Sequence, residues 1–150
     1  MIATKRRKII CLLLIAANLA FIWGNSLMTG ADSGALSGGI LAWINSILGL
    51  GEAGAEVVHL LIRKGAHFTE FACLGLLLAW HFAMADVKGA ALRAFPFLGG
   101  LLAACTDETI QMFVDGRGSS LLDVWVDTFG VLTGITVLLL GHHLKRKHNH

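Results

Sequence analysis

An acidic pair inside an apolar stretch is the feature that most constrains this chain. A helix that crosses a bilayer needs about 20 residues, and residues 94–114 reach that length only if Asp107 and Glu108 are counted in the span. A charged side chain at the bilayer centre costs on the order of 2.5–3.5 kcal/mol on insertion scales, so such residues usually face a protein interior or a wet cavity. The pair therefore directs attention to polar groups elsewhere in the chain.

The composition is that of a membrane protein. Of the 150 residues, 55% are hydrophobic and 15% are charged, and the mean hydropathy is +0.70. These values predict an all-α membrane protein with a single transmembrane domain over residues 1–150. We expect four transmembrane helices, at about residues 9–24, 64–85, 94–114 and 121–141, and one short extracytoplasmic amphipathic helix at about residues 36–50.

The short amphipathic helix follows a stretch, residues 25–39, that is rich in Gly, Ser and Asp and predicts a loop. Apolar residues then recur at helical spacing over a length too short to span a membrane. Two placements remain open. The helix lies in the membrane interface, or it packs on the helix bundle.

Basic residues predict the orientation, because Lys and Arg in short loops favour the cytoplasm. With four spans, the basic residues in 5–8, 88–93 and 145–147 fall on one side, and only Arg63, Lys64 and Arg117 fall on the other. Both termini are therefore expected in the cytoplasm.

This topology places polar residues of three spans at one depth, in their extracytoplasmic halves. The residues are His67 and Glu70 in the second span, Asp107, Glu108 and Gln111 in the third, and Asp123 and Asp127 in the fourth. Within each span they share one helical face. The pattern predicts an outward-facing polar pocket with Arg63, Lys64 and Arg117 at its mouth.

Several functions are compatible with such a pocket. It could be an ion-pair network that only holds helices together, or a binding or catalytic pocket for the polar head of an amphiphile, with His67 as a base oriented by Glu70. A divalent-cation site of His67, Glu70, Asp107 and Glu108 is a weaker alternative, because neighbouring helical residues point about 100° apart and only one of the acidic pair could then bind the same ion. A proton relay is poorly supported, because the cytoplasmic halves of the helices are apolar and offer only His81 as a candidate. The scarce aromatic residues do not suggest nucleic-acid binding.

Three motifs together resemble the VanZ-like family of bacterial membrane proteins. They are Arg63-Lys64-x-Ala66-His67-x-x-Glu70-Phe71-x-x-Leu74-Gly75, then Asp107-Glu108-x-x-Gln111-x-Phe113-x-x-x-Arg117, then Asp123-x-x-x-Asp127-x-x-Gly130-x-x-x-Gly134. The chain differs from the expected pattern at Phe71, where an aromatic hydroxyl often stands, and at Asp127, where an Asn often stands.

The resemblance implies a multi-pass protein of the bacterial cytoplasmic membrane with a role in the cell envelope, because the family takes its name from a protein that confers resistance to the lipoglycopeptide teicoplanin. We expect His67, Glu70, Asp107 and Glu108 to be candidate catalytic residues, and Arg63, Lys64, Gln111, Arg117, Asp123 and Asp127 to contact a lipid-linked or amphiphilic substrate. Expected partners are membrane lipids and a cell-wall lipid precursor or lipoglycopeptide, and no cofactor is predicted. A non-enzymatic binder of antibiotic or cell-wall lipid, and a structural partner of another envelope protein, are the alternatives.

Overall fold

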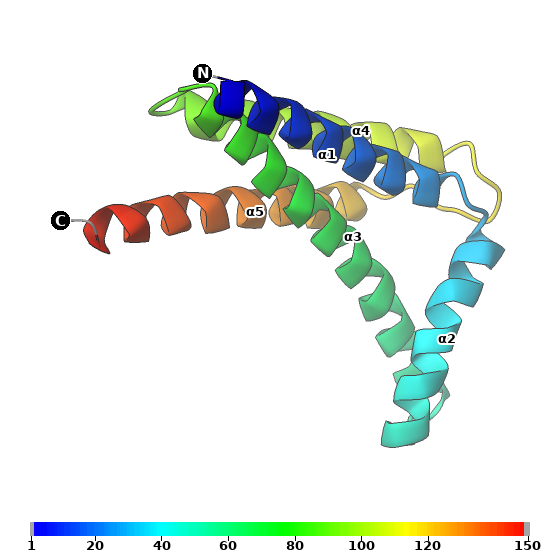
Figure 1. The fold of residues 1–150 in the computed structure, drawn as a ribbon. Helices are drawn as coiled ribbons and strands as arrows, with labels where there is room; N and C mark the ends of the chain where they lie inside the picture. Colours follow the sequence, from blue (N-terminus) through cyan, green and yellow to red (C-terminus); the bar gives the residue numbers. More distant parts are fainter. Residues whose placement is uncertain (1, 149–150) are drawn as a thin grey trace.

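Five α-helices make up the described part of the chain (Figure 1). The computed structural model describes residues 2–148, with the side chains of residues 5–35, 37–145 and 147–148. The helices are α1 (Ile2–Ser26), α2 (Gly30–Leu48), α3 (Glu52–Met84), α4 (Ala91–Gln111) and α5 (Leu121–His148). Within residues 2–148 there is no strand, so the expected all-helical architecture is confirmed.

The helices form a bundle with a projecting hairpin. Helices α1, α4 and α5 pack with the C-terminal part of α3, whereas α2 packs against the N-terminal part of α3 and extends away from the bundle (Figure 1). Both termini lie at the end of the bundle opposite the α1–α2 and α4–α5 connections. The 33 residues of α3 give a length of about 50 Å, which exceeds the hydrocarbon thickness of about 30 Å.

Two of the four expected spans are long and apolar enough to cross a membrane, Lys5–Ser26 in α1 and Leu121–Lys145 in α5. Helices α3 and α4 carry the polar groups described below, and their crossing of a membrane stays a prediction. The outer surface of α4 is nevertheless apolar, with Phe95, Leu98 and Leu102 about half exposed or more. Large exposed apolar surfaces of this kind mark contact with lipid or with another protein.

Helix α2 begins earlier than expected, at Gly30 rather than at about residue 36. The Thr29 hydroxyl accepts a hydrogen bond from the backbone N–H of Asp32 at 3.2 Å, which caps the helix, and the Asp32 carboxylate lies in the positively polarised first turn. The prediction of a loop over residues 25–39 is therefore wrong for most of that range. Gly49, in the left-handed conformation with φ 61°, ends the helix.

Helix α3 begins at Glu52, so it extends well before the membrane span expected at about residues 64–85, and its first turns pack on α2. The Ser37 hydroxyl and His59 Nε2 lie 2.6 Å apart across this contact. The other bounds differ by a few residues: α1 and α5 are longer than predicted, and α4 ends at Gln111 rather than at residue 114.

Glycines let α3 and α5 approach closely. A Cβ atom on Gly134 would lie 2.0 Å from the carbonyl oxygen of Ala72, and one on Gly75 would lie 2.2 Å from the carbonyl oxygen of Val131. No side chain fits at these distances, so the two backbones are in direct contact. Small residues spaced four apart serve this purpose in membrane helices.

Replacing Gly134 by Ala should destabilise the protein, since the added methyl group forces α3 and α5 apart. We expect the free energy of unfolding to fall by about 1–3 kcal/mol, as for other overpacked sites, measured by thermal unfolding in detergent. Gly141→Ala is the matched control on the same helix, because nothing lies within 4 Å of its Cβ position and Ala favours a helix over Gly. Equal effects of the two changes would contradict the close packing.

Candidate functional site

A fully buried carboxylate, Asp107 of α4, joins α1 to α4. The Ser26 hydroxyl, at the end of α1, donates to Asp107 Oδ1 at 2.6 Å. The Gln111 side-chain amide, one helical turn further along α4, donates to Asp107 Oδ2 at 2.8 Å. These charge-assisted hydrogen bonds compensate part of the cost of burying the acid.

His67 of α3 brings a second buried acid to the same place. Its Nδ1 lies 3.8 Å from Asp107 Oδ2 and 3.7 Å from Oδ1 of Asp127, on α5. Asp127 is completely buried, and neither of its carboxylate oxygens has a hydrogen-bond partner among the described residues. Three helices thus meet around one imidazole ring.

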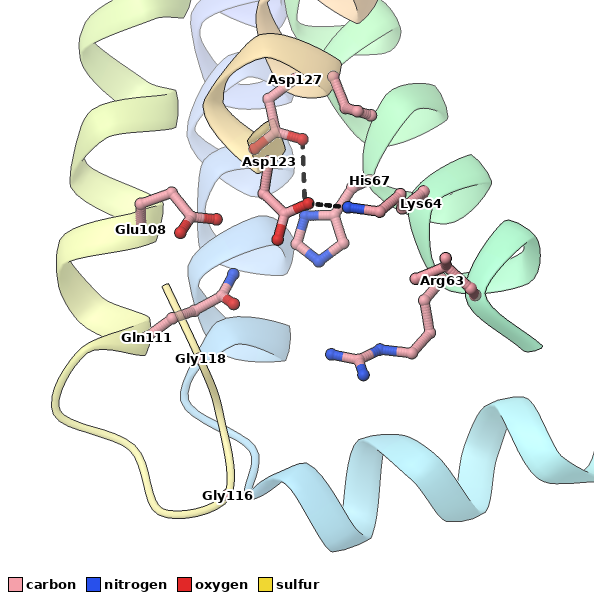
Figure 2. Close-up of a pocket in the computed structure, with 11 residues that line it drawn as sticks. Arg63, Lys64, His67, Glu108, Gln111, Gly116, Gly118, Asp123 and Asp127 are labelled. Carbon is pink, nitrogen blue, oxygen red and sulfur yellow. Dashed lines mark hydrogen bonds and ion pairs between the residues drawn. The ribbon is translucent and has the colours of Figure 1, made fainter. Parts of the chain in front are cut away.

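A pocket of about 170 Å³ opens in front of this cluster (Figure 2). Its polar lining consists of Arg63, Lys64, His67, Glu108, Gln111, Asp123 and Asp127, and Leu60 and Val126 contribute apolar surface. Lys64 forms an ion pair with Asp123. The Arg63 side chain extends from α3 into the space below His67 (Figure 2).

Glu108 faces this pocket and helps to start α5. Its Oε2 accepts a hydrogen bond from the backbone N–H of Ser120 at 2.8 Å, just before α5 begins at Leu121. Its Oε1 is buried and has no hydrogen-bond partner in the described part of the chain. The side chains of Asp107 and Glu108 therefore contact different parts of the protein, as expected for neighbouring residues that point in different directions from a helix.

Glu70 is bound to α1 instead of orienting His67. Its Oε1 accepts a hydrogen bond from the Asn25 amide at 3.1 Å. Across residues 2–148 no hydrogen bond joins Glu70 to His67, so the structure does not form the predicted base-and-orienter pair. The imidazole faces Asp107 and Asp127 in its place.

Arg117 holds the α4–α5 connection against the end of α1. Its Nη2 donates to the carbonyl oxygen of Asn25 at 2.7 Å, and its Nε donates to that of Met28 at 3.0 Å. Burial lowers the pKa of the guanidinium, although arginine remains protonated in proteins. Expected at the mouth of the pocket, this side chain donates instead to the backbone at the end of α1 and in the turn after it.

A second, larger cavity of about 310 Å³ lies beside the first, between α1, α2 and α3. Phe21, Ile40, Ile62 and Ala66 are among its apolar lining, and Asn25, Glu70 and Arg117 are among its polar lining. Arg63 and His67 line both cavities. The polar pocket and this mostly apolar groove therefore share a wall.

The structure brings all ten predicted site residues to one end of the bundle, but their functional roles remain predictions. Through these contacts and cavity walls it connects Arg63, Lys64, His67, Glu70, Asp107, Glu108, Gln111, Arg117, Asp123 and Asp127. Sequence reasoning missed Asn25 and Ser26, the α1 residues that bind two of these acids. Their position directly after the first predicted span, residues 9–24, was the available signal.

Comparison with known proteins places the chain in a family. The family model described as VanZ/LLP1 matches residues 9–142. The chain belongs to the VanZ/LLP1 family. No significant match was found among curated proteins or among solved structures. Together with the two apolar helices α1 and α5, membership of this family indicates a membrane protein.

Replacing Ser26 by Ala should weaken the polar end of the bundle, because Asp107 Oδ1 loses its donor while remaining buried. We expect a loss of about 1–3 kcal/mol in the free energy of unfolding, measured by thermal unfolding in detergent. Ser46→Ala is the control: that hydroxyl bonds the Trp43 carbonyl on exposed α2, so its loss should cost at most about 0.5 kcal/mol. A Ser26 effect no larger than the Ser46 effect would show that the contact contributes nothing.

Proposed function

We propose that this protein acts in the bacterial cell envelope by binding an amphiphile with an anionic head group at the polar end of its bundle. The observation that carries the proposal is the shared wall between the two cavities. An amphiphile has a polar part and an apolar part that are covalently joined, and here a polar pocket and a mostly apolar groove meet at Arg63 and His67.

Arg63 is the residue best placed to bind the head group. Lys64 is paired with Asp123 and Arg117 binds backbone carbonyls, whereas Arg63 is exposed and lines both cavities. A guanidinium binds phosphate or carboxylate through two parallel hydrogen bonds. The inner polar groups, among them Glu108 and Gln111, would accept or donate to hydroxyl and amine groups of the ligand.

The groove between α1, α2 and α3 would take the apolar chain. Phe21 and Ile40 line it from α1 and α2, and Ile62 lines it from α3. Apolar chains gain about 0.8 kcal/mol for each methylene group removed from water. Cell-wall lipid precursors and lipoglycopeptides both combine such chains with polar heads.

Resistance to teicoplanin is the cellular role that family membership suggests. Binding alone could protect a cell by sequestering the antibiotic or the lipid, and a reaction on the lipid would protect it by removing the target. A third role, as the structural partner of another envelope protein, needs no ligand in the pocket.

The proposed location is the cytoplasmic membrane, with both termini in the cytoplasm and the pocket outside. The two termini lie at the end of the bundle opposite the α4–α5 connection (Figure 1), and Gly116 and Gly118 of that connection line the pocket. The basic residues of 5–8, 88–93 and 145–147 belong to that same end or to its connections, which agrees with the bias of cytoplasmic loops toward Lys and Arg.

Arg63→Gln should reduce protection against teicoplanin when the protein is expressed in a susceptible host. Loss of a charged hydrogen-bonding group removes about 1.5–3 kcal/mol of binding, or about tenfold or more in affinity. Arg93→Gln is the control, because Arg93 lies in the first turn of α4, which begins at the opposite end of the bundle (Figure 1). Susceptibility is measured at equal abundance by immunoblot. Unchanged protection with Arg63→Gln would overturn this assignment.

Glu108→Gln separates the three roles, since the amide oxygen can still accept from the Ser120 N–H. Normal abundance with lost protection supports a working pocket, and lost abundance supports a structural role. Mass spectrometry of envelope lipids with and without the protein then distinguishes binding alone from a reaction on the lipid. A changed lipid profile indicates an enzyme, and an unchanged one indicates a binder.

Reporter fusions test the orientation. A fluorescent protein fused after His150 should fluoresce, and alkaline phosphatase fused at the same place should be inactive, because the first folds in the cytoplasm and the second requires the periplasm or cell exterior. The same reporters placed in the α4–α5 connection, after Gly118, should give the opposite pattern. Active phosphatase at both positions would exclude the proposed topology.

A further inference from the structure

The deepest part of the site is a cluster of three potential metal ligands from three helices. His67 of α3, Asp107 of α4 and Asp127 of α5 each present a ligand atom, and all three atoms lie within 4.8 Å of one another. Two atoms bound to one ion at about 2.0–2.2 Å are themselves about 3–4 Å apart. The distances from His67 Nδ1 to the two acids, 3.8 and 3.7 Å, fall in that range.

The cluster has a surplus of unsatisfied acceptors. Asp127 is completely buried, and both of its oxygens, like His67 Nδ1, have no hydrogen-bond partner among the described residues. A buried carboxylate without a partner is strongly destabilising. The described residues therefore provide Asp127 with neither a hydrogen-bond donor nor a full balancing positive charge.

The nearby basic residues do not supply that charge. Lys64 pairs with Asp123, and Arg117 donates to carbonyl oxygens of α1 and of the turn after it. For Asp107 and Asp127, the imidazole of His67 is the basic group within 4 Å in the part of the chain that the structure describes. One ring cannot balance two buried carboxylates.

We propose that His67 Nδ1, Asp107 and Asp127 bind a divalent transition-metal ion. One imidazole nitrogen and two carboxylate oxygens suit Zn²⁺, Mn²⁺ or Fe²⁺ better than Mg²⁺, which prefers oxygen ligands alone. His67 and Asp127 also line the polar pocket. Three protein ligands leave at least one coordination position free, as in catalytic metal sites.

The surroundings of Asp107 support the assignment. Ser26 and Gln111 donate to its two oxygens at 2.6 and 2.8 Å, which fixes the orientation of the carboxylate. Hydrogen bonds of this kind orient metal ligands in known sites. The ligand residues differ from those considered for a cation site from the sequence, because Asp127 takes the place of Glu70 and Glu108. Binding of the ion does not require the proposed amphiphile.

Metal binding is tested on the full-length protein in detergent, purified without a nickel column. The His-rich tail could bind ions on its own, so His142, His143, His148 and His150 are replaced by Gln in every sample. We expect one Zn²⁺ per chain after dialysis against micromolar Zn²⁺, measured by elemental analysis. Co²⁺ added to the metal-free protein should give visible absorption bands from a site with nitrogen and oxygen ligands.

Asp127→Asn should weaken Zn²⁺ binding by at least about tenfold, the loss seen even for residues that only orient a ligand. Asp115→Asn is the matched control: the same change in an exposed residue of the α4–α5 connection that lies outside the cluster. It should bind Zn²⁺ as the unchanged protein does.

His67→Gln provides a second test if Asp127→Asn fails to fold, which is judged by gel filtration and thermal unfolding. It should also lose Zn²⁺ and the Co²⁺ bands. No stoichiometric Zn²⁺, Mn²⁺ or Fe²⁺ in a folded protein would overturn the proposal and leave a protonated Asp127 as the explanation for its burial. Binding that survives Asp127→Asn or His67→Gln would overturn it as well.

Discussion

Burial of acidic side chains governs how this molecule is built. A carboxylate that leaves water must find donors or a counter-ion, and the donors of Asp107 come from the end of α1 and from the next turn of α4. Glu70 likewise depends on Asn25. Because α1 satisfies acids from two other helices, the place where α1 stops is set by polar contacts. The Arg117 guanidinium secures the same place from the α4–α5 connection.

The close packing of α3 on α5 has a direct effect on the polar end. The carbonyl oxygens of Phe68 and Ala72 lie against Gly130 and Gly134. His67 immediately precedes the first α3 residue of this contact, and Asp127 comes one turn before the first glycine of α5. The glycines therefore set the separation of His67 and Asp127. An apolar packing feature in the middle of the bundle thus determines the geometry of the cluster at its end.

The sequence was sufficient for the parts of this structure that depend on periodicity and charge. Helical spacing placed Asp123 and Asp127 on one face, and the charge bias put polar groups of three spans at one end. The rotation of each helix about its axis is not encoded in such patterns, so the partner of Glu70 could not be foreseen. Neutral residues such as Asn25 carry no large burial penalty that would draw attention to them. The start of α2 was obscured because its cap, Thr29, lies within a stretch rich in Gly and Ser.

The hairpin of α2 and α3 gives the site a side approach. Trp43, Ile47 and Leu61 lie exposed on it, each with more than half of its surface accessible, and the groove between this hairpin and α1 leads to Arg63 and His67. In the proposed membrane placement, an amphiphile anchored in the leaflet would reach the groove by diffusing within a plane, without dissolving in the aqueous phase. The same head group, free in solution, would have to find the opening by diffusion in three dimensions. Under the proposed function, the shape of the fold would therefore favour the lipid-bound form of a head group over its free form.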